Sequence, residues 1–141
     1  MNPLKGITLF ETISRKVLEE CRRRNVDGVF ALMSGNTANS AVYYQLIRRV
    51  GPIDQASDGN CYNLMAIAFS KLSFVMAHHR NSGGQTSIIG ELPYMGGRIS
   101  EDREVIYAFS SAEEKVDDEI CKVAEEYYKW IAEARRSTIR F

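Results

Sequence analysis

The stretch NCYNLMAIAFSKLSFVMAHH, from Asn60 to His79, is the longest apolar segment of the chain without glycine or proline. Its apolar residues recur at helical spacing and cover most of the circumference, which predicts a helix. A helix that is apolar on nearly all sides must be covered on nearly all sides, so we expect it to be the central buried helix of the domain. A stretch of about 20 residues could just cross a bilayer, but Lys71 and the two histidines argue against a membrane span.

Length and composition predict one domain over residues 1–141, because a chain of this size buries roughly two-thirds of its unfolded surface. The 18 basic and 18 acidic residues cancel, so no overall field favours nucleic acid or a membrane as a partner. The first residues carry no signal-peptide pattern. The three cysteines are too far apart for a zinc knuckle and odd in number, so we expect reduced thiols in a cytoplasmic protein. They are Cys21, Cys61 and Cys121.

Two further helices are expected, each opened by a capping box in which a hydroxyl and a carboxylate satisfy free backbone N–H groups. The first begins at Thr8 and ends with three arginines at Arg22–Arg24, where cations suit the helix dipole. The second follows Ser111–Glu114, and its apolar stripe extends to Ala134. Residues 136–141 are expected to form an irregular tail.

Five strands are predicted. Gly28–Met33 is apolar on both faces, as in a central strand, and Ala41–Val50 alternates, with Val42, Tyr44 and Leu46 on one face. Three short strands should follow at Thr86–Ile89, Tyr94–Ile99 and Val105–Phe109. The order α-β-β-α-β-β-β-α predicts an α+β fold in which helices pack on the faces of one antiparallel sheet, as in profilin-like folds.

No catalytic group stands out, and we expect a non-enzymatic protein. Cys61 could be activated at a helix N-terminus, but the nearest histidine, His78, lies 17 positions further along the same helix, roughly 25 Å away. His78 and His79 point about 100° apart on a helix, so they would not chelate one metal ion together. We therefore predict no metal site, although either imidazole could offer one nitrogen to a haem iron.

A small-molecule site is the remaining possibility. Gly96-Gly97 in a strand indicates a bulge or a close backbone approach, which could make room for a flat ligand. Lys71 on an otherwise apolar helix face would anchor an acidic ligand group or pair with a carboxylate, and the second use is the commoner. Tyr43 could line such a pocket, although aromatic residues more often belong to a core or a subunit contact.

Short motifs across most of the chain resemble those of one family. They are Ile7-Thr8-Leu9 opening a helix, the strand at Gly28–Met33, Ala68-x-x-Lys71, and Leu92-Pro93 followed by Val105–Ala108 and the acidic Glu113–Asp118. In these the chain resembles the GlcG/HbpS-like family of haem-binding and glycolate-operon proteins, which includes the C-terminal domain of PduO-type adenosyltransferases. The first helix has no histidine, so the haem ligand that some members place there has no counterpart.

The resemblance implies a self-associating, small-ligand-binding protein, with haem or another tetrapyrrole as a possible ligand and a homo-oligomer as the expected assembly. The residues expected around such a ligand are Tyr43, Lys71, His78, His79, Gly96 and Gly97. The alternative is a homodimeric interaction module that pairs through its sheet edge or helices, as roadblock-like profilin-type folds do. A cofactor-processing enzyme is a third hypothesis, and it would need two titratable groups within hydrogen-bond reach in one pocket.

Overall fold

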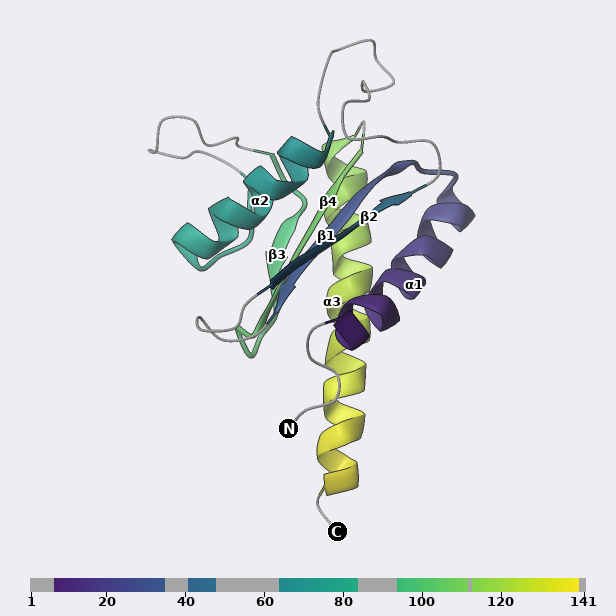
Figure 1. Ribbon diagram of the computed structural model, residues 1–141, viewed down its shortest axis with the longest axis vertical. Coiled ribbons are helices and arrows are strands. Elements are labelled where there is room, and N and C mark those ends of the chain that lie inside the picture. Colours follow the sequence, from purple (N-terminus) through teal and green to yellow (C-terminus); the bar gives the residue numbers. More distant parts are fainter. Residues whose placement is uncertain (1–6, 35–40, 48–63, 84–93, 112, 140–141) are drawn as a thin grey trace.

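The computed structural model describes residues 7–34, 41–47, 64–83, 94–111 and 113–139. Three helices and four strands lie in these ranges (Figure 1). In chain order they are α1 (Ile7–Arg24), β1 (Gly28–Ser34), β2 (Ala41–Ile47), α2 (Leu64–His78), β3 (Gly97–Ile99), β4 (Val105–Ser110) and α3 (Glu114–Ile139). The predicted α+β class, with one antiparallel sheet and helices on its faces, is confirmed.

The sheet has the strand order β2-β1-β4-β3, and every pair of neighbours is antiparallel. β1 is central because its run Val29–Leu32 is apolar on both faces, and all four of these residues are fully buried. The strand predicted at Thr86–Ile89 lies outside the described residues. The order of the other elements agrees with the prediction.

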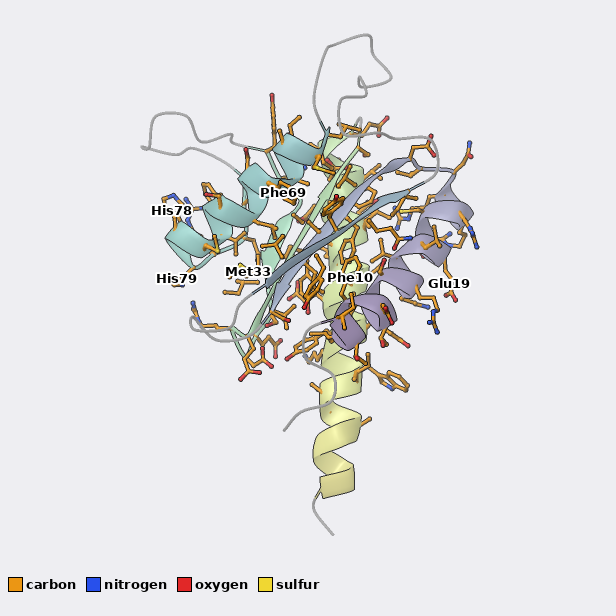
Figure 2. The ribbon with its side chains drawn as sticks, viewed as in Figure 1. Phe10, Glu19, Met33, Phe69, His78 and His79 are labelled. Atoms are coloured by element: carbon orange, nitrogen blue, oxygen red, sulfur yellow. The ribbon has the colours of Figure 1, made fainter. Side chains whose placement is uncertain are left out.

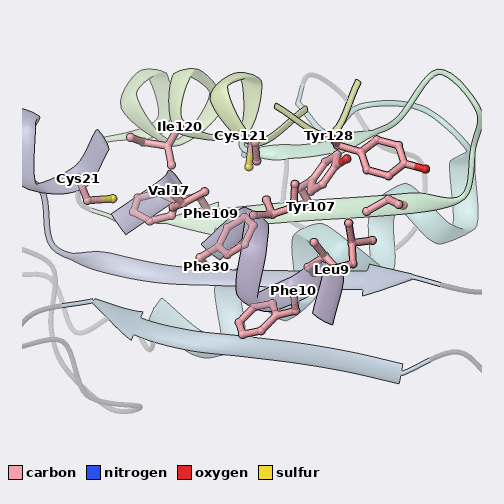
Figure 3. Packing of buried hydrophobic residues seen from close by; sticks show 14 of the residues in the cluster. Leu9, Phe10, Val17, Cys21, Phe30, Tyr107, Phe109, Ile120, Cys121 and Tyr128 are labelled. Atoms are coloured by element: carbon pink, nitrogen blue, oxygen red, sulfur yellow. The ribbon is translucent and has the colours of Figure 1, made fainter. Parts of the chain in front are cut away.

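The two faces of the sheet carry different helices. α1 and α3 cover one face, and α2 covers the other (Figure 1). The larger core lies under α1 and α3 and joins side chains of both helices to Phe30, Tyr107 and Phe109 of the sheet (Figure 3). The smaller core lies under α2, where Ala68 and Leu72 pack on Val29 and Ala31.

The expectation that the Asn60–His79 stretch forms a central buried helix is wrong for its described part. α2 packs against β1, β3 and β4 on one side, while Phe69 and Met76 on the other side are 36% and 42% exposed. The helix is apolar nearly all round, yet the described elements of the sheet cover only one side of it. Packing in the core therefore does not explain why Phe69 and Met76 are apolar.

The tail predicted to be irregular from residue 136 is helical as far as Ile139, and residues 140–141 lie outside the described part. No glycine or proline interrupts the chain between Glu114 and Ile139, so nothing stops the helix. The C-terminal half of α3 extends well beyond the sheet and α1 (Figure 1). Among the described residues, no helix is both long and apolar enough to cross a membrane.

Candidate functional site

Lys71 is the most unusual side chain of α2, because it is charged and only 2% exposed. Its Nζ donates hydrogen bonds to the carbonyl oxygen of Phe109, at 2.8 Å, and to Oδ2 of Asp117, at 2.9 Å. Asp117 belongs to α3, which covers the opposite face of the sheet. The lysine therefore joins the two helical layers at the β3 edge of the sheet.

Gly96 and Gly97 make room for this connection. A Cβ atom on Gly96 would lie 2.9 Å from Nζ of Lys71 and 2.7 Å from Cβ of Asp117, and one on Gly97 would lie 3.1 Å from Cβ of Lys71. Gly96 also has a φ of 108°, a conformation that side chains rarely adopt. The glycine pair is thus required for a close approach, as predicted, but the group that approaches is a lysine of the same chain.

Asp117 is held by several partners. Besides Lys71, the hydroxyl of Ser111 donates a hydrogen bond to its Oδ1. Burial raises the pKa of Asp117 above its ordinary value, and the Lys71 ammonium and the Ser111 hydroxyl partly offset that effect. The carboxylate is therefore stabilised by its partners against a large desolvation penalty.

Cys121 completes this buried cluster. Its Sγ donates to the carbonyl oxygen of Gly96 at 3.1 Å, and burial raises the pKa of the thiol far above its ordinary value. A protonated, enclosed thiol is a poor nucleophile, so this cysteine has a packing role. Cys21 is also buried and forms no disulfide bond with a described residue, whereas Cys61 lies outside the described residues.

The arrangement around Lys71 is an internal connection, and both hydrogen-bond partners of the ammonium group are atoms of this chain. Of the two uses expected for the lysine, the structure has the pairing with a carboxylate. With its side chain only 1% exposed, the ammonium group has almost no contact with solvent. Three of the six residues expected around a ligand, Lys71, Gly96 and Gly97, do lie together.

Tyr43 lies elsewhere in the molecule. It is on β2, at the opposite edge of the sheet from β3, and its ring stacks on Phe10 of α1 at a centroid distance of 5.6 Å. It therefore packs on the α1 and α3 face, while the backbone of Lys71 lies in the helix on the other face. The structure therefore does not bring Tyr43 and Lys71 together.

His78 and His79 lie at the C-terminal end of α2 (Figure 2). His78 packs on Phe74 with ring centroids 4.4 Å apart, and His79 is exposed with a φ of 54°, which ends the helix. Lys71 precedes His78 by two turns, or roughly 10 Å along the helix axis. Haem ligation by either histidine stays a prediction that no observation here tests.

Asp117 is the buried partner that reasoning from the sequence missed. It lies among the acidic residues Glu113–Asp118, which the helix dipole alone would explain. The signal that could have found it is Lys71 itself, since a lysine on an apolar face requires a buried acid. Among the described residues, no group of three or more His, Cys, Asp or Glu side chains could hold a metal ion.

An exposed apolar surface spans β2 and α2. Val42 and Tyr44 on β2 are 48% and 51% exposed, and the Tyr44 ring meets Phe69 of α2 edge to face at a centroid distance of 5.9 Å. Met76 lies two turns beyond Phe69 on the same helix face, and it is also exposed. We call these four residues the β2–α2 surface.

The β2–α2 surface is exposed because α2 does not extend over the whole width of the sheet. Val42 pairs with Met33 and Tyr44 with Ala31, so both side chains lie on the α2 face. α2 packs over β1, β3 and β4, and it reaches β2 through the contact between Phe69 and Tyr44. The body of the helix lies over the other three strands, so Val42 and Tyr44 of β2 remain about half exposed on this face.

Searches of protein-family models, curated proteins and solved structures find no match to this chain.

Proposed function

We propose that the protein is a non-enzymatic, self-associating interaction module whose subunits pair along β2. The observation that carries the proposal is the β2–α2 surface, which adjoins β2, an outer strand of the sheet among the described residues. Exposed aromatic residues that adjoin an unpaired strand are typical of a surface that binds another protein.

The edge of β2 is suited to strand pairing. Monomeric proteins protect edge strands with charged residues, proline or bulges. Ala41–Ile47, with the sequence AVYYQLI, contains no charged residue and no proline, and its seven residues pair with β1 without interruption. No described strand pairs with its outer edge, where the regular backbone can offer N–H and C=O groups to a partner strand.

A second copy of the chain fits this edge best. A two-fold axis through the middle of the strand, at Tyr44, would place two β2 strands antiparallel and form one continuous sheet. The two Tyr44 side chains would then meet across the axis, with Phe69 of each subunit beside them. A neutral strand also pairs with itself without repulsion between like charges.

The Tyr44→Lys variant tests the proposal by sedimentation equilibrium over a range of protein concentrations. The wild type should associate reversibly to a dimer, and the variant should remain a monomer, because a charge on the strand opposes edge pairing. Since Tyr44 is half exposed, the variant should fold normally by circular dichroism.

Trp130→Lys is the matched control, because Trp130 is an exposed aromatic residue on α3, away from β2. It should dimerise like the wild type. A monomeric wild type at high concentration, or equal loss of the dimer in both variants, would refute pairing along β2.

A further inference from the structure

Helix α1 lies along the outer strand β2. It packs over β2 and β1, and α3 packs beside it over β4 and β3 (Figure 1). Phe10 of α1 stacks on Tyr43, and Ser14 donates a hydrogen bond to Gln45. Four helical residues rise about 6 Å and two strand residues about 7 Å, so these two contacts show that the helix and the strand run side by side in the same direction.

The two flanks of α1 have different surroundings. Lys16 and Arg24 lie on the flank next to α3, where they contact Tyr127 and Glu119. The opposite flank faces the outer edge of β2, because α3 lies on the β3 side of α1. Residues that recur at helical spacing make up this second flank. We call them the α1 flank: Ile7, Glu11, Ser14 and Leu18.

The α1 flank presents both apolar and charged groups to its surroundings. Ile7 is 52% exposed, and Leu18 is partly exposed. Glu11 between them is exposed, as is Arg15 one turn further along the helix. Neither of these two charges forms an ion pair with a described residue.

Pairing along β2 would bring two copies of the α1 flank together. A two-fold axis at Tyr44, normal to the sheet, lies half a strand spacing from each β2, or roughly 2.4 Å. Because α1 lies over β2 and β1, the axes of the two α1 helices would be roughly 5 to 14 Å apart. That range includes the spacing of packed helices, about 8–10 Å. The two-fold axis makes the two helices antiparallel.

The contacts of α1 with β2 also fix the register of the two helices. Tyr44 lies between the two strand residues that contact Phe10 and Ser14. The axis therefore passes α1 near its residues 12 and 13. Two antiparallel helices centred there place Ile7 of each copy beside Leu18 of the other, which would cover both apolar side chains.

The charges favour the same arrangement. In this register Glu11 of each copy lies opposite Arg15 of the other, so the dimer would hold two pairs of opposite charge. Such exposed pairs contribute modestly to affinity, but they disfavour partners that lack the complementary charge.

The size of the interface gives a separate reason for this contact. A stable interface buries about 800 Å² on each partner and involves roughly 20–30 residues a side. The strand β2 contributes seven residues. A neighbouring element must supply more contacts, and α1 runs along the strand.

We propose that the α1 flank binds the α1 flank of a second copy, antiparallel across the two-fold axis. This contact makes β2 select a copy of its own chain as its partner. The inference rests on the proposed pairing along β2 and names the second element of that interface.

A mixture of two charge variants tests the proposal by native mass spectrometry at low salt. Glu11→Arg leaves only cations at the contact, and Arg15→Glu leaves only anions, so each variant alone should dimerise about tenfold more weakly than the wild type. In an equimolar mixture, heterodimers should exceed the one-half expected by chance, because their contacts join opposite charges. Repulsion within each helix persists in the mixture, so it cannot cause this preference.

Glu19→Arg and Arg23→Glu are the matched control pair. These two residues have the same spacing on α1 and are exposed, but they lie outside the α1 flank. Their mixture should follow the chance distribution. Circular dichroism should show the same helix content in all four variants.

The outcomes separate this contact from pairing along β2. A chance distribution in the first mixture, or an equal preference in the control mixture, would overturn the α1 contact. If Tyr44→Lys is then still monomeric, pairing along β2 stands without it. A dimeric Tyr44→Lys would refute pairing along β2 and the α1 contact with it.

Discussion

Lys71 and Asp117 are 46 positions apart in the sequence and form one buried ion pair. Their side chains are 1% and 4% exposed, so each charge depends on the other for its stability in the interior. Removing one partner of such a pair costs far more than removing both, because the remaining charge stays buried without compensation.

We predict that Lys71→Met lowers the free energy of unfolding at neutral pH by about 3–5 kcal/mol. The double variant Lys71→Met/Asp117→Leu should lose clearly less. Urea unfolding followed by circular dichroism would measure both values. If the double variant were as unstable as the single one, the uncompensated carboxylate would not be the cause.

The stability of the Lys71→Met variant should also decrease as the pH rises. Without the ammonium group, the folded-state pKa of Asp117 should rise further above its ordinary value of 3.8. The folded state then binds the proton more tightly than the unfolded state, so stability falls as the pH rises through this window. The deficit of the variant should therefore shrink as the pH falls toward about 4, in urea titrations at several pH values.

For single residues, the sequence indicates that a side chain has an unusual environment, but it does not indicate which residue that side chain contacts. The burial of Lys71 and the close approach at Gly96 both follow from local patterns. Asp117 does not, because the helix dipole offers a sufficient reason for an acid in that turn. The sequence also gives no sign that the Tyr107 hydroxyl is buried without a hydrogen-bond partner among the described residues, because tyrosine is common in strands.

Among the elements, α1 is tied to its surroundings by charges near its C-terminus. Glu20 forms ion pairs with Arg23 and Arg24, and Arg24 also pairs with Glu119 of α3. The hydrogen bonds from the two arginines lower the pKa of Glu20 to about 2. This group links the end of α1 to α3.

We predict that Glu20→Gln destabilises the protein above about pH 4.5, and that the difference from the wild type disappears as the pH approaches 2. The folded-state pKa of Glu20 is depressed, so its contribution is present above the ordinary pKa and is lost as the pH falls through about 2. Thermal unfolding at low salt across this range would measure it. Because these charges are near the surface, about 1 M salt should reduce the effect, and a difference that is constant with pH would contradict the assignment.

The elements also show where a pattern is ambiguous. An apolar residue has the same periodicity whether it faces a core or a subunit interface. Phe69 and Met76 predicted a helix buried on all sides, yet they lie on its outer face. The pattern predicts the helix and its inner face, but it does not distinguish an outer face that is covered from one that is exposed.

For the whole molecule, the class of fold follows from the order of its elements. Hairpin-length connections and a doubly apolar strand at Gly28–Met33 favour one antiparallel sheet, and the sheet is built around that strand. The distribution of three helices over the two faces could not be predicted in the same way. It depends on tertiary packing, in which α1 and α3 share one core and α2 forms another.

The pair of Lys71 and Asp117 also bears on how the molecule opens. α2 covers the smaller core, and its main contacts among the described elements are with three strands, so by itself it would be the first layer to detach in a local fluctuation. The ammonium group of Lys71, however, donates a hydrogen bond to Asp117 of α3. Amide protons of α2 and of the first turns of α3 should therefore exchange with solvent through one shared opening event in the wild type, and through two separate events once Lys71 is replaced by methionine.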